Sequence, residues 1–207
     1  MSRPLVAVLD YGIGNLRSAE RALAHCGADA RLTTDAELAR RADAVVLPGV
    51  GAFGACMRAL RAAGLEPVAR DAAASGRPFL GICVGMQLLA TRGVEHGITE
   101  GLGWIAGEVH PIERTDPAIK IPHMGWNDVA LAPHARDNAV LEPGEAYFLH
   151  SYEFQPEDGH HVAAMTDHGG GIVAAVARDT IVGVQFHPEK SQSYGLEMLE
   201  RFLQWRP

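Results

Sequence analysis

A cysteine between two glycines is the feature of this chain best suited to chemistry. Residues 81–87 read GICVGMQ, so Cys83 lies where an apolar run at 78–82 meets a helical pattern at 84–91. A sharp strand-turn-helix strains the backbone of a nucleophile, and flanking glycines let neighbouring backbone pass without a Cβ clash. The N-terminus of a helix also favours thiolate over thiol. The pattern therefore indicates a nucleophile elbow, although the motif alone is equally compatible with a buried structural cysteine.

A histidine and a carboxylate that could serve this cysteine lie far downstream, in the run GVQFHPEKS at residues 183–191. Pro188 restricts φ and takes the chain out of the expected strand, so His187 and Glu189 should project from a rigid corner. In α/β proteins, binding and catalytic sites lie at the edge of the sheet where the parallel strands have their C-terminal ends, and this corner is expected there. A thiol nucleophile needs an imidazole that takes its proton and a carboxylate that fixes the tautomer of the ring. Cys83, His187 and Glu189 can fill these roles, but a surface position for His187 is the alternative.

The motifs around these residues resemble those of the class I, triad-type glutamine amidotransferases. Members of this family hydrolyse the side-chain amide of glutamine and pass the ammonia to a synthase. Over nearly its whole length the chain is similar to the glutaminase subunits of imidazole glycerol phosphate synthases. The class shares the elbow and the His-Pro-Glu, whereas DYGIGN and PHMGWN in this order are typical of these subunits. The runs that carry the resemblance are DYGIGNLRS at 10–18, PGVGAFG at 48–54, PHMGWN at 122–127 and YFLHSY at 147–152.

The resemblance implies an open, mostly parallel α/β sheet flanked by helices, with an added antiparallel region. It also implies a single amidotransferase domain over residues 1–207. In the family, the tetrahedral oxyanion is stabilised by two backbone N–H groups, which correspond here to those of Val50 and Val84. Gly49 and Gly51 border the same loop and are expected to lie against the substrate. The alternative is that these glycines only form a turn before a helix.

Further residues are expected to bind the amino-acid end of glutamine. Gln87 follows Cys83 by one helical turn and should face the same side of the helix. The resemblance places Ser151 and Tyr152 against the backbone-like part of the substrate and Glu95 near its ammonium group. The family has an acidic cluster where this chain reads ATRGVE at residues 90–95, so a shifted loop could remove the contact of Glu95.

The resemblance also implies a partner protein that uses the ammonia, since we expect a single domain in this chain. The partner is a (β/α)₈-barrel cyclase that forms a heterodimer with the glutaminase and makes imidazole glycerol phosphate in histidine biosynthesis. The expected interface residues are Tyr11, Asn15, Trp126 and Lys190. Trp126 could instead be a core aromatic residue, and Lys190 could be a solvated surface charge.

The composition argues against several other classes of protein. The 207 residues are 47% hydrophobic and 21% charged, as in ordinary globular domains, and the net charge of −7 argues against nucleic-acid binding. The opening apolar run at 5–9 is too short for a membrane span or a signal peptide. Three cysteines without paired spacing suit a reducing compartment. We therefore expect a cytoplasmic protein that binds neither nucleic acid nor membrane.

No cofactor or metal is expected from the sequence. The glycines at residues 12–14 follow a predicted strand, but Arg17 occupies the place of the third glycine in a dinucleotide-binding motif. The chain also has no C-x-x-C or H-x-x-x-H pattern for zinc.

Hydrophobic periodicity predicts the elements that must position this chemistry. In the first half strands and helices alternate, which predicts a parallel sheet. These elements span residues 5–9, 16–26, 44–47, 53–63, 79–82 and 84–91. After Gly97, shorter runs predict antiparallel strands, followed by a closing helix at 194–205. The strands span residues 104–112, 128–131, 146–154, 162–166, 172–177 and 181–186.

Three alternative functions stay open at this point. A stand-alone thiol hydrolase would act on another γ-glutamyl or ester substrate without a partner. A non-catalytic sensor would bind glutamine or a protein without turnover. The glutaminase subunit of another synthase would keep the triad but serve a different acceptor. The complete triad argues against the sensor, and the DYGIGN and PHMGWN runs argue against the stand-alone hydrolase.

Overall fold

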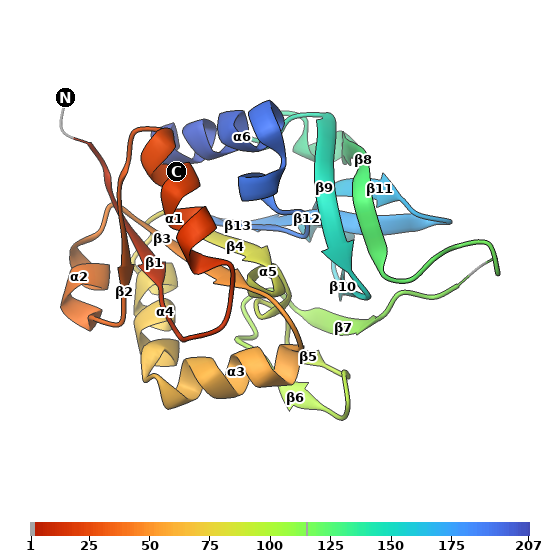
Figure 1. The fold of residues 1–207 in the computed structure, drawn as a ribbon, viewed down its shortest axis with the longest axis horizontal. Coiled ribbons are helices and arrows are strands. Elements are labelled where there is room, and N and C mark those ends of the chain that lie inside the picture. The colour runs from red at the N-terminus through yellow and green to blue at the C-terminus, as the bar shows by residue number, and fades with distance from the viewer. Residues whose placement is uncertain (1–2, 115) are drawn as a thin grey trace.

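The computed structural model describes residues 3–114 and 116–207, and Figure 1 shows its ribbon. The strands are β1 (Leu5–Leu9), β2 (Asp29–Thr33), β3 (Ala44–Gly49), β4 (Phe79–Cys83), β5 (Arg92–Gly93), β6 (Thr99–Glu100), β7 (Gly107–Pro111), β8 (His123–Leu131), β9 (Gly144–His150), β10 (Tyr152–Pro156), β11 (Val162–Asp167), β12 (Gly171–Arg178) and β13 (Ile181–Val184). The α-helices are α1 (Leu16–His25), α2 (Ala36–Arg41), α3 (Phe53–Ala62), α4 (Leu65–Ala74), α5 (Val84–Gln87) and α6 (Gln192–Gln204). Short 3₁₀ turns are η1 (Pro133–Ala135), η2 (Gly159–His161) and η3 (Pro188–Lys190).

A nine-stranded sheet forms the centre of the molecule, with strand order β2-β1-β3-β4-β13-β12-β11-β8-β9. Its first five strands are parallel and the rest pair antiparallel, which confirms the predicted α/β architecture. Helices α1 and α6 lie together above the sheet in Figure 1, α3 and α4 lie below it, and α2 lies at the left beside β2 and contacts α4. Because helices cover both of its faces, β3 is buried along its whole length, as is β4.

The parallel order of β3, β4 and β13 brings three distant segments to one edge of the sheet. Cys83, at the end of β4, pairs with Gly49 at the end of β3. On the other side Ile82 pairs with Val184, the last residue of β13. Since the carboxyl ends of parallel strands meet at one edge, the loop after β3, the elbow and the His187 corner become neighbours.

A smaller four-stranded sheet, β10-β7-β5-β6, covers the same end of the molecule. The single strand predicted at residues 146–154 is wrong, because the chain leaves the large sheet after His150 and enters the small one at Tyr152. Ser151 is the junction between β9, which pairs with β8, and β10, which pairs with β7. Both strands are apolar and alternate alike, so periodicity could not reveal the change of partner. The strand predicted at 104–112 shortens to β7.

The helix predicted at residues 84–91 is also wrong in length, since α5 is one turn that ends at Gln87. The carbonyls that follow do not continue the helix and instead accept hydrogen bonds from residues 101–105. Gly101 makes this possible, because a Cβ there would lie 2.3 Å from the Ala90 carbonyl oxygen. The bonds run from Gly101 N to Thr91 O, Leu102 N to Leu88 O, Gly103 N to Ala90 O, and Trp104 N and Ile105 N to Leu89 O.

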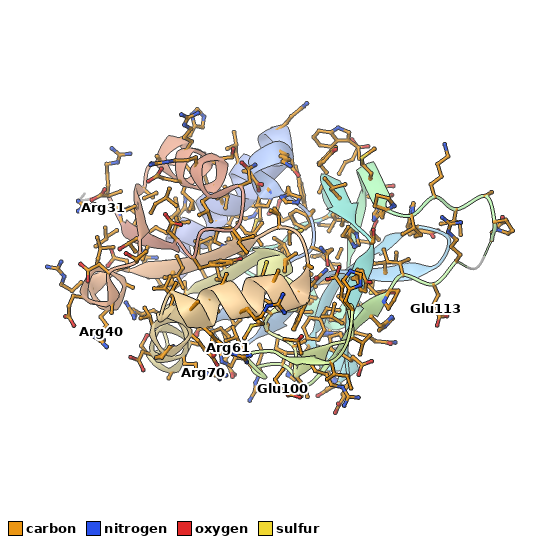
Figure 2. The ribbon with its side chains drawn as sticks, turned by 60° about the horizontal axis from the view of Figure 1, so that its bottom comes forward. Arg31, Arg40, Arg61, Arg70, Glu100 and Glu113 are labelled. Carbon is orange, nitrogen blue, oxygen red and sulfur yellow. The ribbon has the colours of Figure 1, made fainter. Side chains whose placement is uncertain are left out.

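Arginines on the helices below the sheet tie the small sheet to them, as Figure 2 shows at the labelled Arg61, Arg70 and Glu100. Both arginines pair with Glu66, at 2.9 and 2.8 Å, and donate to the carbonyl oxygens of Glu100 and Leu102. Such half-exposed ion pairs contribute little energy individually. Their geometric effect is to hold the segment after α5 against α3 and α4.

Among the helices of the described residues, none is long and apolar enough to cross a membrane.

Candidate active site

Cys83 occupies a strained elbow between β4 and α5. Its φ of 54° and ψ of −114° are rare for a residue with a side chain, as expected for a nucleophile at such a turn. Both neighbouring glycines allow a close approach of backbone. A Cβ on Gly85 would lie 1.8 Å from the Leu47 carbonyl oxygen, and one on Gly81 would lie 2.7 Å from the Gly85 oxygen. These contacts give the physical reason for the G-x-C-x-G spacing.

Gly85→Ala is therefore expected to destabilise the protein, by about 3 kcal/mol or more in free energy of unfolding. The added methyl group would collide with backbone of β3, which cannot move aside as a flexible side chain would. Urea denaturation followed by circular dichroism measures the change. Gly159→Ala is the matched control, since a Cβ at Gly159 meets no atom within 4 Å. Equal stability of the two variants would contradict the packing argument.

His187 and Glu189 form the buried pair that the sequence predicts. His187 Nδ1 lies 2.8 Å from Glu189 Oε1, and each side chain is 3% exposed. Ser191 holds this corner, because its hydroxyl donates to His187 O at 2.7 Å and accepts from Tyr147 N at 2.9 Å. The corner is thereby fixed to β9, which the sequence did not reveal.

The imidazole of His187 also interacts with the Cys83 sulfur, which completes the Cys-His-Glu arrangement. Burial lowers the pKa of His187, but hydrogen bonds and charge attraction from Cys83 and Glu189 outweigh it and raise the pKa to about 9. The ring is therefore protonated at neutral pH when it faces a thiolate. A one-turn α5 contributes little macrodipole, so this imidazolium takes over the stabilising role that we expected from a longer helix.

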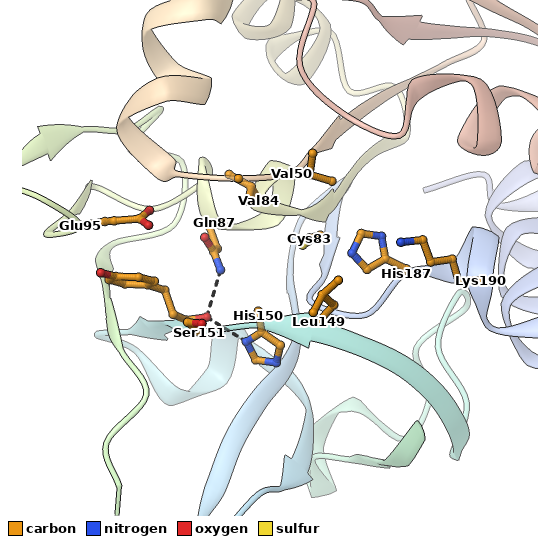
Figure 3. A pocket seen from close by; sticks show the side chains of 12 residues that line it. Val50, Cys83, Val84, Gln87, Glu95, Leu149, His150, Ser151, His187 and Lys190 are labelled. Atoms are coloured by element: carbon orange, nitrogen blue, oxygen red, sulfur yellow. Dashed lines mark hydrogen bonds between the residues drawn. The ribbon is translucent and has the colours of Figure 1, made fainter. Parts of the chain in front are cut away.

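A cavity of about 140 Å³ lies next to Cys83 (Figure 3). It brings together most of the residues expected to bind substrate and form the oxyanion hole. Its lining consists of Val50, Gly51, Cys83, Val84, Gln87, Glu95, Leu149, His150, Ser151, Tyr152, His187 and Lys190. Leu149 and His150 were not foreseen, although both belong to the YFLHSY run.

Two side chains that line the cavity already use one polar atom in hydrogen bonds within the protein. Glu95 Oε2 accepts from Phe53 N at 2.7 Å, so it caps α3 while it faces the cavity. Glu95 therefore lines the cavity, and its contact with glutamine stays a prediction. Gln87 Nε2 donates to the Tyr152 carbonyl oxygen at 3.1 Å and to Gln185 Oε1 at 2.9 Å. Only the carbonyl oxygen of Gln87 is left to accept from an ammonium group.

The loop that carries Val50 is held from behind by two side chains. The Tyr11 hydroxyl donates to Pro48 O at 2.6 Å, and Cys56 Sγ lies 3.2 Å from Val50 O. Gly51 has a φ of 86°, which a residue with a side chain adopts rarely. Val84 begins α5, so its N–H has no partner within the helix. The two proposed oxyanion donors thus line the cavity, Val50 from the loop after β3 and Val84 from the start of α5.

The residues expected at the partner interface divide into two groups. Tyr11 is 5% exposed, and its buried phenol positions the Pro48 carbonyl; contact of the segment at residues 11–15 with a partner stays a prediction. Asn15 is half-buried, and its Nδ2 lies 3.5 Å from Glu189 Oε1, next to the triad. Trp126 is 42% exposed on β8, which overturns the core alternative, and Lys190 lines the cavity mouth.

Gln185 is the principal site residue that the sequence analysis missed. It is fully buried, and its Nε2 lies 3.7 Å from Cys83 Sγ. A signal was available, because Gln185 is a polar residue in the apolar run that leads into the His-Pro-Glu corner and precedes His187 by two. Over residues 3–114 and 116–207, no three His, Cys, Asp or Glu side chains form a cluster that could hold a metal ion.

Comparisons with known proteins show the family of this chain. The model of the glutamine amidotransferase class-I family matches residues 7–205. The HisH subunit of imidazole glycerol phosphate synthase from Zymomonas mobilis is 55% identical over 207 residues, which cover 98% of this chain and 96% of that protein. The HisH subunit from Caulobacter vibrioides is 50% identical over 210 residues, with 98% and 99% covered.

Among solved structures, a crystal structure of a glutamine amidotransferase shares the fold. Its TM-score is 0.74 at 21% identity, and the match covers 96% of this chain and 97% of that one. At this identity the likeness concerns the fold alone, whereas the sequence matches extend over nearly the full length of both chains. The chain therefore belongs to the class I glutamine amidotransferase family and, within it, to the HisH subunits of imidazole glycerol phosphate synthase.

Proposed function

We propose that this chain, acting as one amidotransferase domain, hydrolyses L-glutamine to glutamate and ammonia through a thioester on Cys83. The observation that carries the proposal is the meeting of a cysteine in a strained elbow with a buried His187–Glu189 pair at a cavity. A thiol, an imidazole and a carboxylate in this order are the groups that nucleophilic acyl transfer requires.

In the proposed mechanism the Cys83 thiolate attacks the δ-carbon of glutamine, and the carbonyl oxygen becomes an oxyanion. The N–H groups of Val50 and Val84 stabilise this charge. The C–N bond then breaks while the His187 imidazolium protonates the departing ammonia. His187 next takes a proton from water, which attacks the thioester, and glutamate leaves as the thiolate is restored.

The amino-acid end of glutamine would lie at the opposite end of the cavity from His187. Glu95 Oε1 and the carbonyl oxygen of Gln87 can accept hydrogen bonds from the α-ammonium group, because their other polar atoms are already bonded. Ser151 and Tyr152 border the same region. Gly51 leaves space for the substrate beside the oxyanion loop, whereas Gly49 lies outside the cavity lining, and a Cβ there would lie 2.6 Å from the Tyr11 hydroxyl oxygen.

Ammonia release from glutamine, measured for the isolated chain and for the chain with its synthase partner, tests the proposal. We expect release from free glutamine that rises when the partner is present. A chain that releases no ammonia in either state would contradict the proposed activity, and one that prefers other γ-glutamyl compounds or esters without a partner would be a stand-alone thiol hydrolase.

The ammonia is proposed to pass to a (β/α)₈-barrel cyclase, with which this chain forms a heterodimer in the cytoplasm. The complex acts as a lyase and makes imidazole glycerol phosphate in histidine biosynthesis. The similar proteins from Zymomonas mobilis and Caulobacter vibrioides are subunits of that synthase, which supports a partner. An exposed apolar patch next to the cavity supports the binding of the partner at this place. Met124 and Leu149 are 65% and 37% exposed on β8 and β9 and face each other across the pair, and Trp126 faces Tyr147 in the same way. Contiguous exposed apolar side chains commonly mark protein interfaces.

Lys190 is proposed to couple partner binding to catalysis. Its Nζ lies 5.9 Å from the Tyr147 ring centroid, between the apolar patch and the cavity. A peptide reorientation at Gly49 to Gly51 would control one oxyanion donor, worth about a hundredfold in rate. We therefore expect the isolated chain to be about a hundredfold slower than the complex, and Lys190→Ala in the complex to lose much of that gain.

Steady-state ammonia release by the isolated chain, the complex and the complex with Lys190→Ala measures the coupling. Arg40→Ala removes another exposed cation at the far end of the molecule and serves as the control (Figure 2). If the isolated chain matched the complex, coupling would be absent. If Lys190→Ala matched wild type within a coupled complex, the signal would run through other residues.

A further inference from the structure

A continuous line of buried polar groups leads from the nucleophile to the far side of the antiparallel sheet. Gln185 Nε2 contacts Cys83 Sγ, and Gln185 Oε1 accepts from Gln87 Nε2, which also donates to the Tyr152 carbonyl oxygen. On the other side of that carbonyl, His150 Nδ1 lies 2.9 Å away. His150 Nε2 lies 3.0 Å from His123 Nδ1. The mechanism proposed above uses neither histidine and does not use Gln185.

The far end of this line is fixed by the orientation of one amide. Asn127 Nδ2 donates to Asp167 O at 2.7 Å, and Asn127 Oδ1 accepts from Asp128 N at 2.9 Å. The amide therefore cannot be reversed without the loss of both bonds. Its Nδ2 lies 3.1 Å from His123 Nε2, so that ring nitrogen must be an acceptor.

The Asn127 amide at one end and the Tyr152 carbonyl at the other fix the direction of the hydrogen bonds between them. Because His123 Nε2 accepts, the neutral ring carries its proton on Nδ1 and donates it to His150 Nε2. His150 then carries its proton on Nδ1 and donates to Tyr152 O, which can only accept. The Asn127 amide and the Tyr152 carbonyl therefore require the same tautomer, with the proton on Nδ1 of each ring. All the hydrogen bonds are made only when His123 and His150 are both neutral.

The surroundings keep both rings neutral and in place. Burial lowers the pKa of His150 to about 3 and that of His123 to about 4, and the neighbouring His168 lowers both. His187 lowers the pKa of His150 further. The His123 ring is stacked on both faces, with centroid distances of 4.1 Å to His168 and 4.7 Å to Phe148.

At the other end, this line orients two amides in the active site. The Tyr152 carbonyl and Gln185 Oε1 both accept from Gln87 Nε2, which leaves the carbonyl oxygen of Gln87 for the substrate. Since Gln185 Oε1 is the acceptor, its NH₂ group must face the Cys83 sulfur. An N–H aimed at the sulfur stabilises the thiolate that attacks glutamine.

We infer that Gln185 donates a hydrogen bond to the Cys83 thiolate during catalysis, and that the neutral His150–His123 pair is a positioning relay that holds Gln87 and Gln185 in this orientation. The inference rests on the proposed glutaminase function. Gln185 touches the reacting atom, whereas the histidines act only through the Tyr152 carbonyl and Gln87.

The first test replaces Gln185 by methionine, which keeps the length of the side chain but has no N–H donor. We expect alkylation of Cys83 by iodoacetamide at pH 7, followed by mass spectrometry of its peptide, to slow about tenfold, and kcat of the complex to fall about as much. Gln155→Met is the control, because Gln155 is exposed on β10 and bonded to His110. Wild-type alkylation and kcat in Gln185→Met would overturn the role of Gln185.

Should Gln185→Met fail to fold, Gln185→Leu tests the same point, because leucine also fills the buried site without an N–H donor. Slowed alkylation is again expected. Alkylation needs neither glutamine nor a partner, so it separates the two ideas. A wild-type complex without ammonia release would refute the glutaminase function, whereas an active complex that tolerates both substitutions would refute only the inference.

The second test compares two replacements of His150. Asparagine places an N–H where Nδ1 lies and keeps the donor to the Tyr152 carbonyl, whereas phenylalanine has none. We expect His150→Phe to raise KM for glutamine about tenfold through a misplaced Gln87, and His150→Asn to stay within about threefold of wild type. A purely structural role would lower the melting temperature of both variants without separating their KM values. Equal KM values in the two variants would overturn the relay.

Discussion

Cys83→Ala is expected to abolish ammonia release from glutamine, with a loss of about ten-thousandfold or more, as for removal of a covalent nucleophile. The reason is that the thioester cannot form without the sulfur, whereas binding by Gln87 and Glu95 persists. The complex should still make product from added ammonium salts, since the site that uses ammonia is proposed to lie on the partner chain. Assays with glutamine and with ammonium salts, run side by side, measure both quantities.

Cys26→Ala is the matched control, because Cys26 lies at the end of α1 and its sulfur contacts the Leu196 carbonyl, far from the cavity. This variant should keep wild-type activity with either nitrogen source. Substantial glutamine-dependent activity in Cys83→Ala would refute the nucleophile assignment. Loss of both activities would mean that the substitution disturbs the fold or the complex.

His187→Asn should reduce the glutaminase rate about a thousandfold, which is the usual contribution of a general acid and base. Glu189→Gln should cost less, on the order of tens of fold, because it removes one charge-assisted hydrogen bond and keeps the shape of the side chain. The order of the two losses distinguishes a proton-transfer residue from the residue that orients it. Equal and negligible losses would show that the His-Pro-Glu corner is structural.

The pH profile gives the same pair a second readout. The pKa of His187 is raised to about 9, so the imidazolium that protonates ammonia is present at neutral pH and disappears as the pH rises through that value. The rate is therefore expected to fall on the alkaline side near pH 9. Since Glu189 helps to raise this pKa, Glu189→Gln should move the fall to lower pH. An alkaline limb that does not move would contradict the coupling of the two side chains.

Some residues expected at the partner interface also contact the triad or the oxyanion loop. Asn15 was expected at the partner surface, yet it contacts Glu189, and Tyr11 holds the Pro48 carbonyl beneath the oxyanion loop. Lys190 follows the catalytic corner and lines the cavity. The segment after β1 is thus in direct contact with the machinery that a partner would control. These contacts give partner binding a short physical route to the triad.

The sequence by itself determined the chemistry and the parallel half of the sheet. The triad could be read from local patterns, because an elbow needs glycines at Gly81 and Gly85 and a rigid corner needs Pro188. The alternation of apolar runs predicted β1, β3, β4 and the helices α1 and α3 nearly to the residue. Each of these features depends on side chains that are close in the chain, which is the information that periodicity contains. The elements it missed, such as β2, α2, β5 and β6, are short or weakly apolar.

Only the tertiary structure decided which partners the polar groups find. Helix α5 ends after one turn because the carbonyls beyond it bond to residues 101–105, and the run around Ser151 divides because its two halves pair with different strands. Gln185, His150 and His123 looked like ordinary residues of strands until their side chains were seen to satisfy one another. A buried polar group must find a partner, and the bonds that link His123 to His150, Gln87 to Tyr152 and Gln185, and Gln185 to Cys83 span 27 to 102 residues, beyond the reach of any local pattern.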